Sequence, residues 1–190
     1  MQISSHQLLD QLIRQNEAAT LAAQKLKQEL NEVQLNSKPT PQTWSILECI
    51  EHLNLYGDYY LPEIEKRLIS SQKADQSNRI FKSGIIGNYF ANSMLVNEGK
   101  IQKMKTPKDK NPAFVSSQVS SLAIERFLKQ QEKLRTLLID AKNIDLNKVK
   151  TSIALTSLIK LKLGDTLRFV VYHIDRHLWQ ANNVRKSLKH

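Results

Sequence analysis

Glycine and proline, the residues that most often form turns, are scarce in this chain. Together they make up ten of 190 residues, less than half of the usual share of about 12%. Sandwiches, barrels and doubly wound sheets need many turns, so the shortage predicts long helices joined by few connections. The five glycines are also too scattered for a G-x-G-x-x-G or P-loop motif, which excludes the common nucleotide-binding loops.

Cysteine content and hydropathy indicate the cellular compartment of the protein and whether it has a membrane segment. A single cysteine, Cys49, cannot form an internal disulfide or a cysteine-rich zinc site, and it fits a reducing compartment. The first residues show no basic region followed by an apolar segment, as a secretory signal would. The apolar runs fall far short of the roughly 20 residues that span a bilayer. We therefore expect a cytoplasmic protein with no membrane segment.

Apolar residues recur at helical spacing in four long segments. These predicted helices cover about residues 5–35, 45–68, 116–141 and 165–188. The long segment between the second and third is predicted to hold a broken helix at 83–92 and an exposed crossing loop at 104–112. Residues 158–163 alternate like a short extended segment. The pattern predicts an all-α fold: a four-helix bundle with a long crossing segment, forming one domain over residues 1–190.

Three histidines fall on corresponding flanks of two predicted helices. His173 and His177 are an i, i+4 pair, so both rings project from one side of the last helix. At about 100° per residue, both lie at the border of its apolar stripe, and His52 lies on the same flank of the second helix. Three neutral imidazoles can bind zinc or nickel and leave coordination positions open. The alternative is three ordinary half-buried histidines.

Two motifs containing these histidines resemble those of the DinB/YfiT-like family. The segment from Pro41 to Leu53 resembles the W-S-x-x-E-x-x-x-H-L signature that opens the second helix of these proteins. Leu163-Gly164-Asp165, followed by the segment from His173 to Gln180, resembles the closing H-x-x-R-H-x-x-Q element. The order and separation of the two motifs also match, whereas the middle third of the chain carries little of the resemblance.

The resemblance implies a fold, a metal and a class of chemistry. It implies a DinB-like four-helix bundle in which His52, His173 and His177 hold a divalent metal, commonly zinc or nickel. Similar proteins are often homodimers, so a homodimer is expected. Characterised members include transferases and isomerases that use low-molecular-weight thiols such as bacillithiol or mycothiol, and others are described as metal-dependent hydrolases. The family name records induction by DNA damage rather than an activity on DNA.

Two residues near His52 have both a structural and a functional interpretation. Glu48 can orient His52 from one helical turn away, but Ser45 and Glu48 also fit a capping box, which we favour. Cys49 can be a thiolate ligand, but a small buried hydrophobic residue is the favoured interpretation.

Four further residues have the same ambiguity. Arg176 can bind an anionic substrate or form a structural ion pair. Tyr56 and Tyr59 follow His52 by about one and two turns and can line a cleft or simply pack. Trp179 lies opposite the histidine flank, which suggests packing against the crossing loop or a dimer partner.

Three functions are compatible with the motifs and with the formal charge of +10. The leading one is a metal-dependent transferase or hydrolase that acts on a small molecule, with the metal activating a thiol or a water. The second is a non-catalytic metal-binding module of a stress response. Nucleic-acid binding is the least favoured, since the basic residues lack interleaved aromatic residues or a reading-helix motif. The charge concentrates in residues 100–110 and 148–190, where it can attract an anionic thiol or an acidic substrate.

Overall fold

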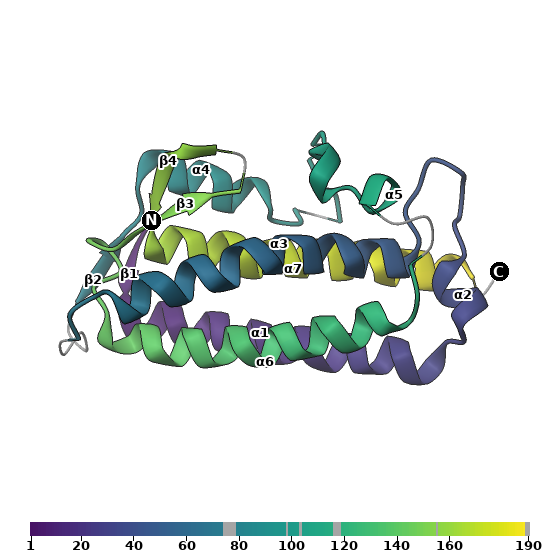
Figure 1. The fold of residues 1–190 in the computed structure, drawn as a ribbon, viewed down its shortest axis with the longest axis horizontal. Coiled ribbons are helices and arrows are strands. Elements are labelled where there is room, and N and C mark those ends of the chain that lie inside the picture. Colours follow the sequence, from purple (N-terminus) through teal and green to yellow (C-terminus); the bar gives the residue numbers. More distant parts are fainter. Residues whose placement is uncertain (74–78, 98, 103, 116–118, 155, 189–190) are drawn as a thin grey trace.

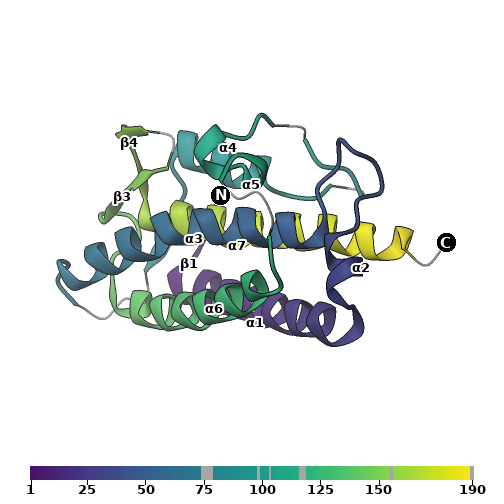
Figure 2. The ribbon, with the colours of Figure 1, turned by 45° about the vertical axis from the view of Figure 1, so that its right-hand side comes forward.

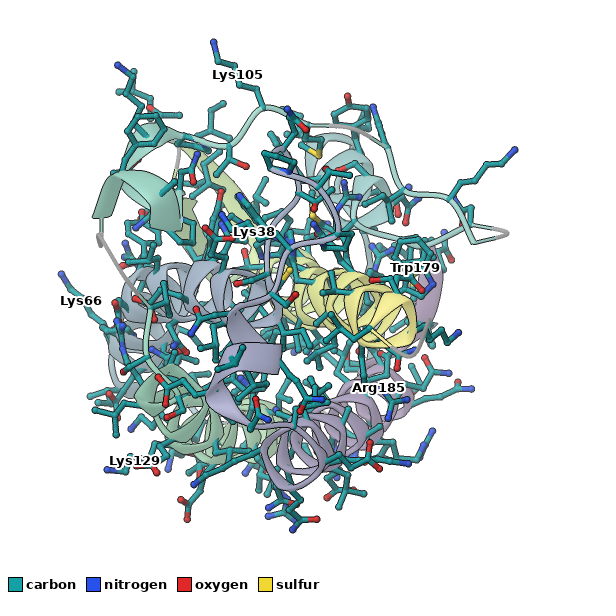
Figure 3. The ribbon with its side chains drawn as sticks, turned by 90° about the vertical axis from the view of Figure 1, so that its right-hand side faces the viewer. Lys38, Lys66, Lys105, Lys129, Trp179 and Arg185 are labelled. Carbon is teal, nitrogen blue, oxygen red and sulfur yellow. The ribbon has the colours of Figure 1, made fainter. Side chains whose placement is uncertain are left out.

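Four long helices dominate the structure, a computed structural model that describes residues 1–73, 79–97, 99–102, 104–115, 119–154 and 156–188. They are α1 (Ser5–Glu29), α3 (Ile46–Ile69), α6 (Leu122–Asp140) and α7 (Leu163–Ser187). In Figure 1, α3 and α7 form one layer, and α1 and α6 form the other. Viewed end-on in Figure 3, the four helices occupy the corners of a square. The structure is mostly helical, in agreement with the predicted all-α class.

The core lies between these helices and is built from their apolar stripes. Leu12 of α1, Ile50 of α3, Phe127 of α6 and Leu167 of α7 are completely buried. Burial of each such side chain stabilises the fold by roughly 1.5–3 kcal/mol. No helix in the described ranges is long and apolar enough to cross a membrane.

The first helix is shorter than its periodicity predicts. It ends at Glu29, and a separate short helix, α2 (Glu32–Asn36), follows. Asn31 begins α2 with a capping box, because its side chain accepts from the Gln34 amide and the Gln34 side chain accepts from the Asn31 amide. The prediction of one helix over 5–35 is therefore wrong at this break. Val33, which continues the apolar periodicity of that segment, is 81% exposed.

The segment between α3 and α6 covers the outer side of the α3–α7 layer (Figure 2). It contains β2 (Ile80–Lys82), α4 (Ile85–Ser93), the 3-10 helix η1 (Lys108–Lys110) and α5 (Pro112–Val115). The helix expected at 83–92 is confirmed as α4. The prediction of an exposed loop at 104–112 is wrong at its end, because Pro112 is buried and Lys110 is half-buried against α3. The predicted start of the third helix at 116 lies outside the described residues, and α6 begins at Leu122.

Two small antiparallel strand pairs complete the described structure. The extended segment expected at 158–163 is confirmed as part of β4 (Thr156–Lys162), which pairs with β3 (Lys150–Ile153) in the register Thr151↔Leu161. Near the chain start, β1 (Gln2–Ser4) pairs with β2. Another 3-10 helix, η2 (Ala141–Asn143), follows α6.

A buried polar cluster fixes α4 to the start of α7. Asp165 accepts hydrogen bonds from the Gly84 amide, at 2.8 Å, and from the Ser83 hydroxyl. It also pairs with Arg168, whose guanidinium donates to the side chains of Asn88 and Asn92 on α4. Since Asp165 and Arg168 are 0% and 2% exposed, this cluster sets the position of α4 over α7.

The glycine of the Leu163-Gly164-Asp165 motif has a packing role. A Cβ atom at Gly164 would lie 2.5 Å from the ring of Phe81, which is completely buried. Such a distance requires the ring to move, so only glycine allows β2 to approach the start of α7 this closely.

Candidate metal centre

Three histidines from two neighbouring helices meet beneath the crossing segment. His52 of α3 and His173 and His177 of α7 are 3%, 6% and 7% exposed. Their candidate ligand nitrogens all lie within 4.8 Å of one another, and the two Nε2 atoms of His52 and His173 are 3.1 Å apart. The structure thus brings together all three histidines that the sequence singles out.

Hydrogen bonds at the outer ring nitrogens orient two of the histidines. His52 Nδ1 lies 2.6 Å from the carbonyl oxygen of Lys110, and His177 Nδ1 lies 3.1 Å from Oε1 of Gln180. Both oxygens can only accept, so we assign the proton to Nδ1 in each ring. The Nε2 atoms then keep their lone pairs, as a metal-binding imidazole requires.

Aromatic side chains enclose the three imidazoles. The Trp44 ring lies 4.8 Å from His52 and 5.7 Å from His177, between ring centroids. Phe169 stacks on His173 at 5.6 Å, and Tyr56 contacts the same ring edge-on at 4.6 Å. These contacts restrict the rings to few rotamers, which holds their nitrogens close together.

The surroundings keep the imidazoles neutral. Burial lowers the pKa of His52 to about 4, and the positive charges of Arg176 and Lys110 contribute in the same direction. Burial also holds the pKa values of His173 and His177 well below the ordinary value, with further contributions from the neighbouring rings and from Arg176. At neutral pH the cluster therefore offers lone pairs rather than protons.

The donor set fits a divalent transition metal. Imidazole nitrogens suit zinc, nickel and copper, and three of them leave positions open for other ligands. Around one zinc ion, nitrogens at bond lengths of about 2.1 Å lie on the order of 3.4 Å apart. The observed separations, up to 4.8 Å, are compatible with this after a modest side-chain adjustment.

The three histidines line a pocket under the crossing segment. Its cavity volume is about 100 Å³, and part of the pocket is open to solvent. No described lining residue is acidic. Besides the histidines, the lining comprises Tyr56, Tyr60, Phe90, Met94, Met104, Lys105, Thr106, Pro107, Ile153, Leu161, Phe169 and Arg176.

The contacts of Glu48 and Cys49 distinguish their structural from their functional interpretations. Glu48 accepts from the Ser45 amide at 2.8 Å, completing the capping box, and its other oxygen pairs with Lys38 at 2.7 Å. The capping interpretation is confirmed. Cys49 is completely buried, and this burial, together with the nearby negative charge of Glu48, raises its pKa. It remains a protonated thiol at neutral pH, which agrees with a packing role.

The remaining predicted residues divide between the pocket and its surroundings. Tyr56 lines the pocket, whereas Tyr59 donates to the Ser152 hydroxyl and the Ile153 carbonyl and so fixes the β3–β4 hairpin. Arg176 lines the pocket and donates to two backbone carbonyls rather than to a described carboxylate. Trp179 is half-buried on the outer flank of α7 (Figure 3).

Several residues at the site have no functional assignment from sequence. Trp44 and Gln180 both lie in the quoted motifs, so the motifs contained a signal for them. The role of the Lys110 carbonyl could not be read from the sequence, because every residue has a backbone carbonyl oxygen. Its position depends on how the crossing segment folds over α3.

Replacing Gln180 with alanine tests the orienting hydrogen bond to His177. We expect metal affinity to fall by about 10–100-fold without loss of the fold, as when outer partners of metal-binding histidines are removed. Glu48→Gln is the matched control, because glutamine can maintain the capping box and the described hydrogen bonds of Glu48 go to Ser45 and Lys38 rather than to His52. Zinc titration against a competing chelator measures both. Equal affinities in wild type and Gln180→Ala would contradict the assigned role.

Fold and site together define a mostly helical protein with a buried cluster of three histidines. The family model of the DinB superfamily matches residues 12–181, a range that includes all three histidines. The chain belongs to the DinB superfamily. Searches of curated proteins and of solved structures found no significant match.

Proposed function

We propose that the protein is a metal-dependent enzyme of the transferase or hydrolase type, acting on a small molecule with a low-molecular-weight thiol or water as nucleophile. We infer that the four long helices form the four-helix bundle of the family, as one domain. The observation that carries the proposal is the convergence of three neutral imidazoles in the lining of one pocket. His52, His173 and His177 would hold a divalent zinc or nickel ion, which would act there as a Lewis acid on a thiol or water and on an electrophile.

The residues around the pocket can position a substrate but provide few proton acceptors. Burial, followed by the negative charge of Asp109, raises the pKa of Tyr56 to about 12. Its phenol therefore keeps its proton at neutral pH and can donate a hydrogen bond to a substrate oxygen. The described lining contains no carboxylate that could act as a general base. This composition suits activation of the nucleophile by the metal.

The basic residues do not favour nucleic acid as the partner. In Figure 3, Lys105 extends from the top of the molecule, Lys66 from the left and Lys129 from the lower left. Lys38 is paired with Glu48, and Arg185 with Glu29. A nucleic-acid surface instead concentrates its positive charge on one face. The homodimer implied by the family remains a prediction.

A turnover screen tests the proposed function. Zinc- and nickel-loaded protein is mixed with low-molecular-weight thiols and a panel of electrophiles, and separately with activated esters. We expect at least one metal-dependent reaction that His177→Ala abolishes and Lys129→Ala, on a distant flank (Figure 3), retains. Equal rates in wild type and His177→Ala would overturn the proposal. Absence of turnover in fully loaded protein would favour the non-catalytic metal-binding module.

A further inference from the structure

A buried cation forms part of the pocket wall. Arg176 is 5% exposed, and its guanidinium donates from Nη1 to the Ser93 carbonyl at 3.2 Å and from Nη2 to the Gln102 carbonyl. These carbonyls satisfy two donors but carry no net charge. Within the described part of the chain, no carboxylate lies within ion-pair distance of Arg176, in contrast to Arg168, which pairs with Asp165. A buried charge without a counter-charge is costly, so its retention at a pocket indicates an anionic ligand.

The guanidinium has donors left for such a ligand. Arginine carries five N–H donors in a rigid fork, and two of them are used by the two carbonyls. The other three have no acceptor among the described residues. The other described cation of the lining, Lys105, extends away from the bundle into solvent (Figure 3). Arg176 is thus the better placed of these two cations to bind an anion inside the pocket.

Arg176 is also electrostatically close to the histidine cluster. Its charge contributes to the lowered pKa of His52, of His173 and of His177. A divalent metal on three neutral imidazoles keeps its full charge, which adds to that of the guanidinium. Because the described lining contains no acidic residue, the occupied pocket would be strongly positive and would favour a negatively charged substrate.

The rest of the pocket is apolar and suits an uncharged body attached to the anion. Phe90 comes from α4 and Met94 directly follows that helix. Phe169 comes from α7, and Ile153 and Leu161 come from the β3–β4 hairpin. An aromatic or branched aliphatic group fits such a lining, and a fully hydrated ligand does not.

We propose that the pocket binds an amphipathic carboxylate, with the carboxylate on Arg176 and an aromatic or branched aliphatic body against the apolar lining, beside the three histidines. This assignment names the substrate class of the site and rests on the proposed function for the reaction that follows. Binding of the carboxylate depends on residues of this chain, so it can be measured without any turnover.

Three probes test the assignment by titration calorimetry at pH 7.5: 4-phenylbutanoate, its neutral analogue 4-phenylbutanamide, and acetate. Metal content is measured on the same samples. We expect 4-phenylbutanoate to bind about 10–100-fold more tightly than the amide. A hydrogen bond between the charged carboxylate and the charged guanidinium strengthens binding by about this factor. Acetate, which lacks the apolar body, should bind more weakly than 4-phenylbutanoate.

Two variants show whether Arg176 is responsible. Arg176→Gln should abolish the preference for 4-phenylbutanoate over the amide at unchanged metal content and leave the amide affinity within about twofold of wild type. Lys105→Gln removes the other described cation of the lining and should keep the preference. The amide serves as the control for pocket integrity, because Arg176 also tethers the crossing segment.

Three results would overturn the assignment. Wild type could bind 4-phenylbutanoate and the amide equally, or the preference for 4-phenylbutanoate could survive in Arg176→Gln. In the third, Arg176→Gln would lose affinity for both probes to the same extent. The last would show that Arg176 only holds the pocket in shape. Metal-loaded protein that binds 4-phenylbutanoate no better than the amide would contradict the carboxylate assignment but not the proposed function. Protein that keeps the preference but neither binds metal nor turns over counts against the proposed function alone.

Discussion

Replacing Asp165 with alanine should lower the free energy of unfolding by about 3–5 kcal/mol, the cost of breaking a buried ion pair. Asp165 and Arg168 have side chains that are 1% and 3% exposed, with Nη1 and Oδ1 3.3 Å apart. The substitution leaves the Arg168 cation buried without its carboxylate. It also frees the Gly84 amide at the start of α4. Urea unfolding followed by circular dichroism measures the change.

An exposed ion pair provides the matched control for this prediction. Glu17 pairs with Arg135 at 3.1 Å, and both side chains are about half exposed at 47% and 51%. Glu17→Ala should cost less than about 1 kcal/mol. In a double-mutant cycle, Asp165→Ala and Arg168→Ala should be non-additive by about 0.5–3 kcal/mol, because they share one network. Additive effects, each as small as that of Glu17→Ala, would show that this cluster does not hold α4 in place.

Removing the metal should also destabilise the protein strongly. A ligand that binds only the native state stabilises it by about 4 kcal/mol at a thousand times its dissociation constant. For a chain of this size, the loss corresponds to a decrease in Tm on the order of 10 °C. We therefore expect excess chelator to lower the Tm of zinc-loaded protein and added zinc to restore it. Differential scanning calorimetry gives both values.

The His173→Ala variant shows whether this effect comes from the histidine cluster. Its Tm should not respond to chelator or to added zinc, because one of the three converging nitrogens is missing. An unchanged Tm in chelated wild type, or an equal decrease in the variant, would place the effect elsewhere in the molecule.

The predictable part of the fold is the part set by local sequence. Apolar periodicity located all four long helices, because each buries one stripe against its neighbours. It missed the break before α2, since Asn31 lies within an apparently continuous pattern and becomes a helix start through its reciprocal bonds with Gln34. Strands β1, β2 and β3 were also missed, as their three or four residues are too short to show a period.

The candidate site was predictable where its residues lie on regular helices. The positions of His52, His173 and His177 follow from helical geometry once α3 and α7 are neighbours. The outer partner of His52 could not be predicted, because it is a backbone carbonyl of the crossing segment. The setting of Arg176 depends on the same segment, whose carbonyls at Ser93 and Gln102 accept its hydrogen bonds. Long-range packing, rather than local pattern, determines these contacts.

The most direct test of the three-histidine centre is the metal content of purified protein, reconstituted with zinc or nickel and freed of excess ion. Elemental analysis should find one equivalent per chain in wild type and in His6→Ala, whose ring lies near Lys142, away from the cluster. His173→Ala should contain essentially none. Full occupancy in His173→Ala, or wild-type protein that retains no metal, would contradict the account.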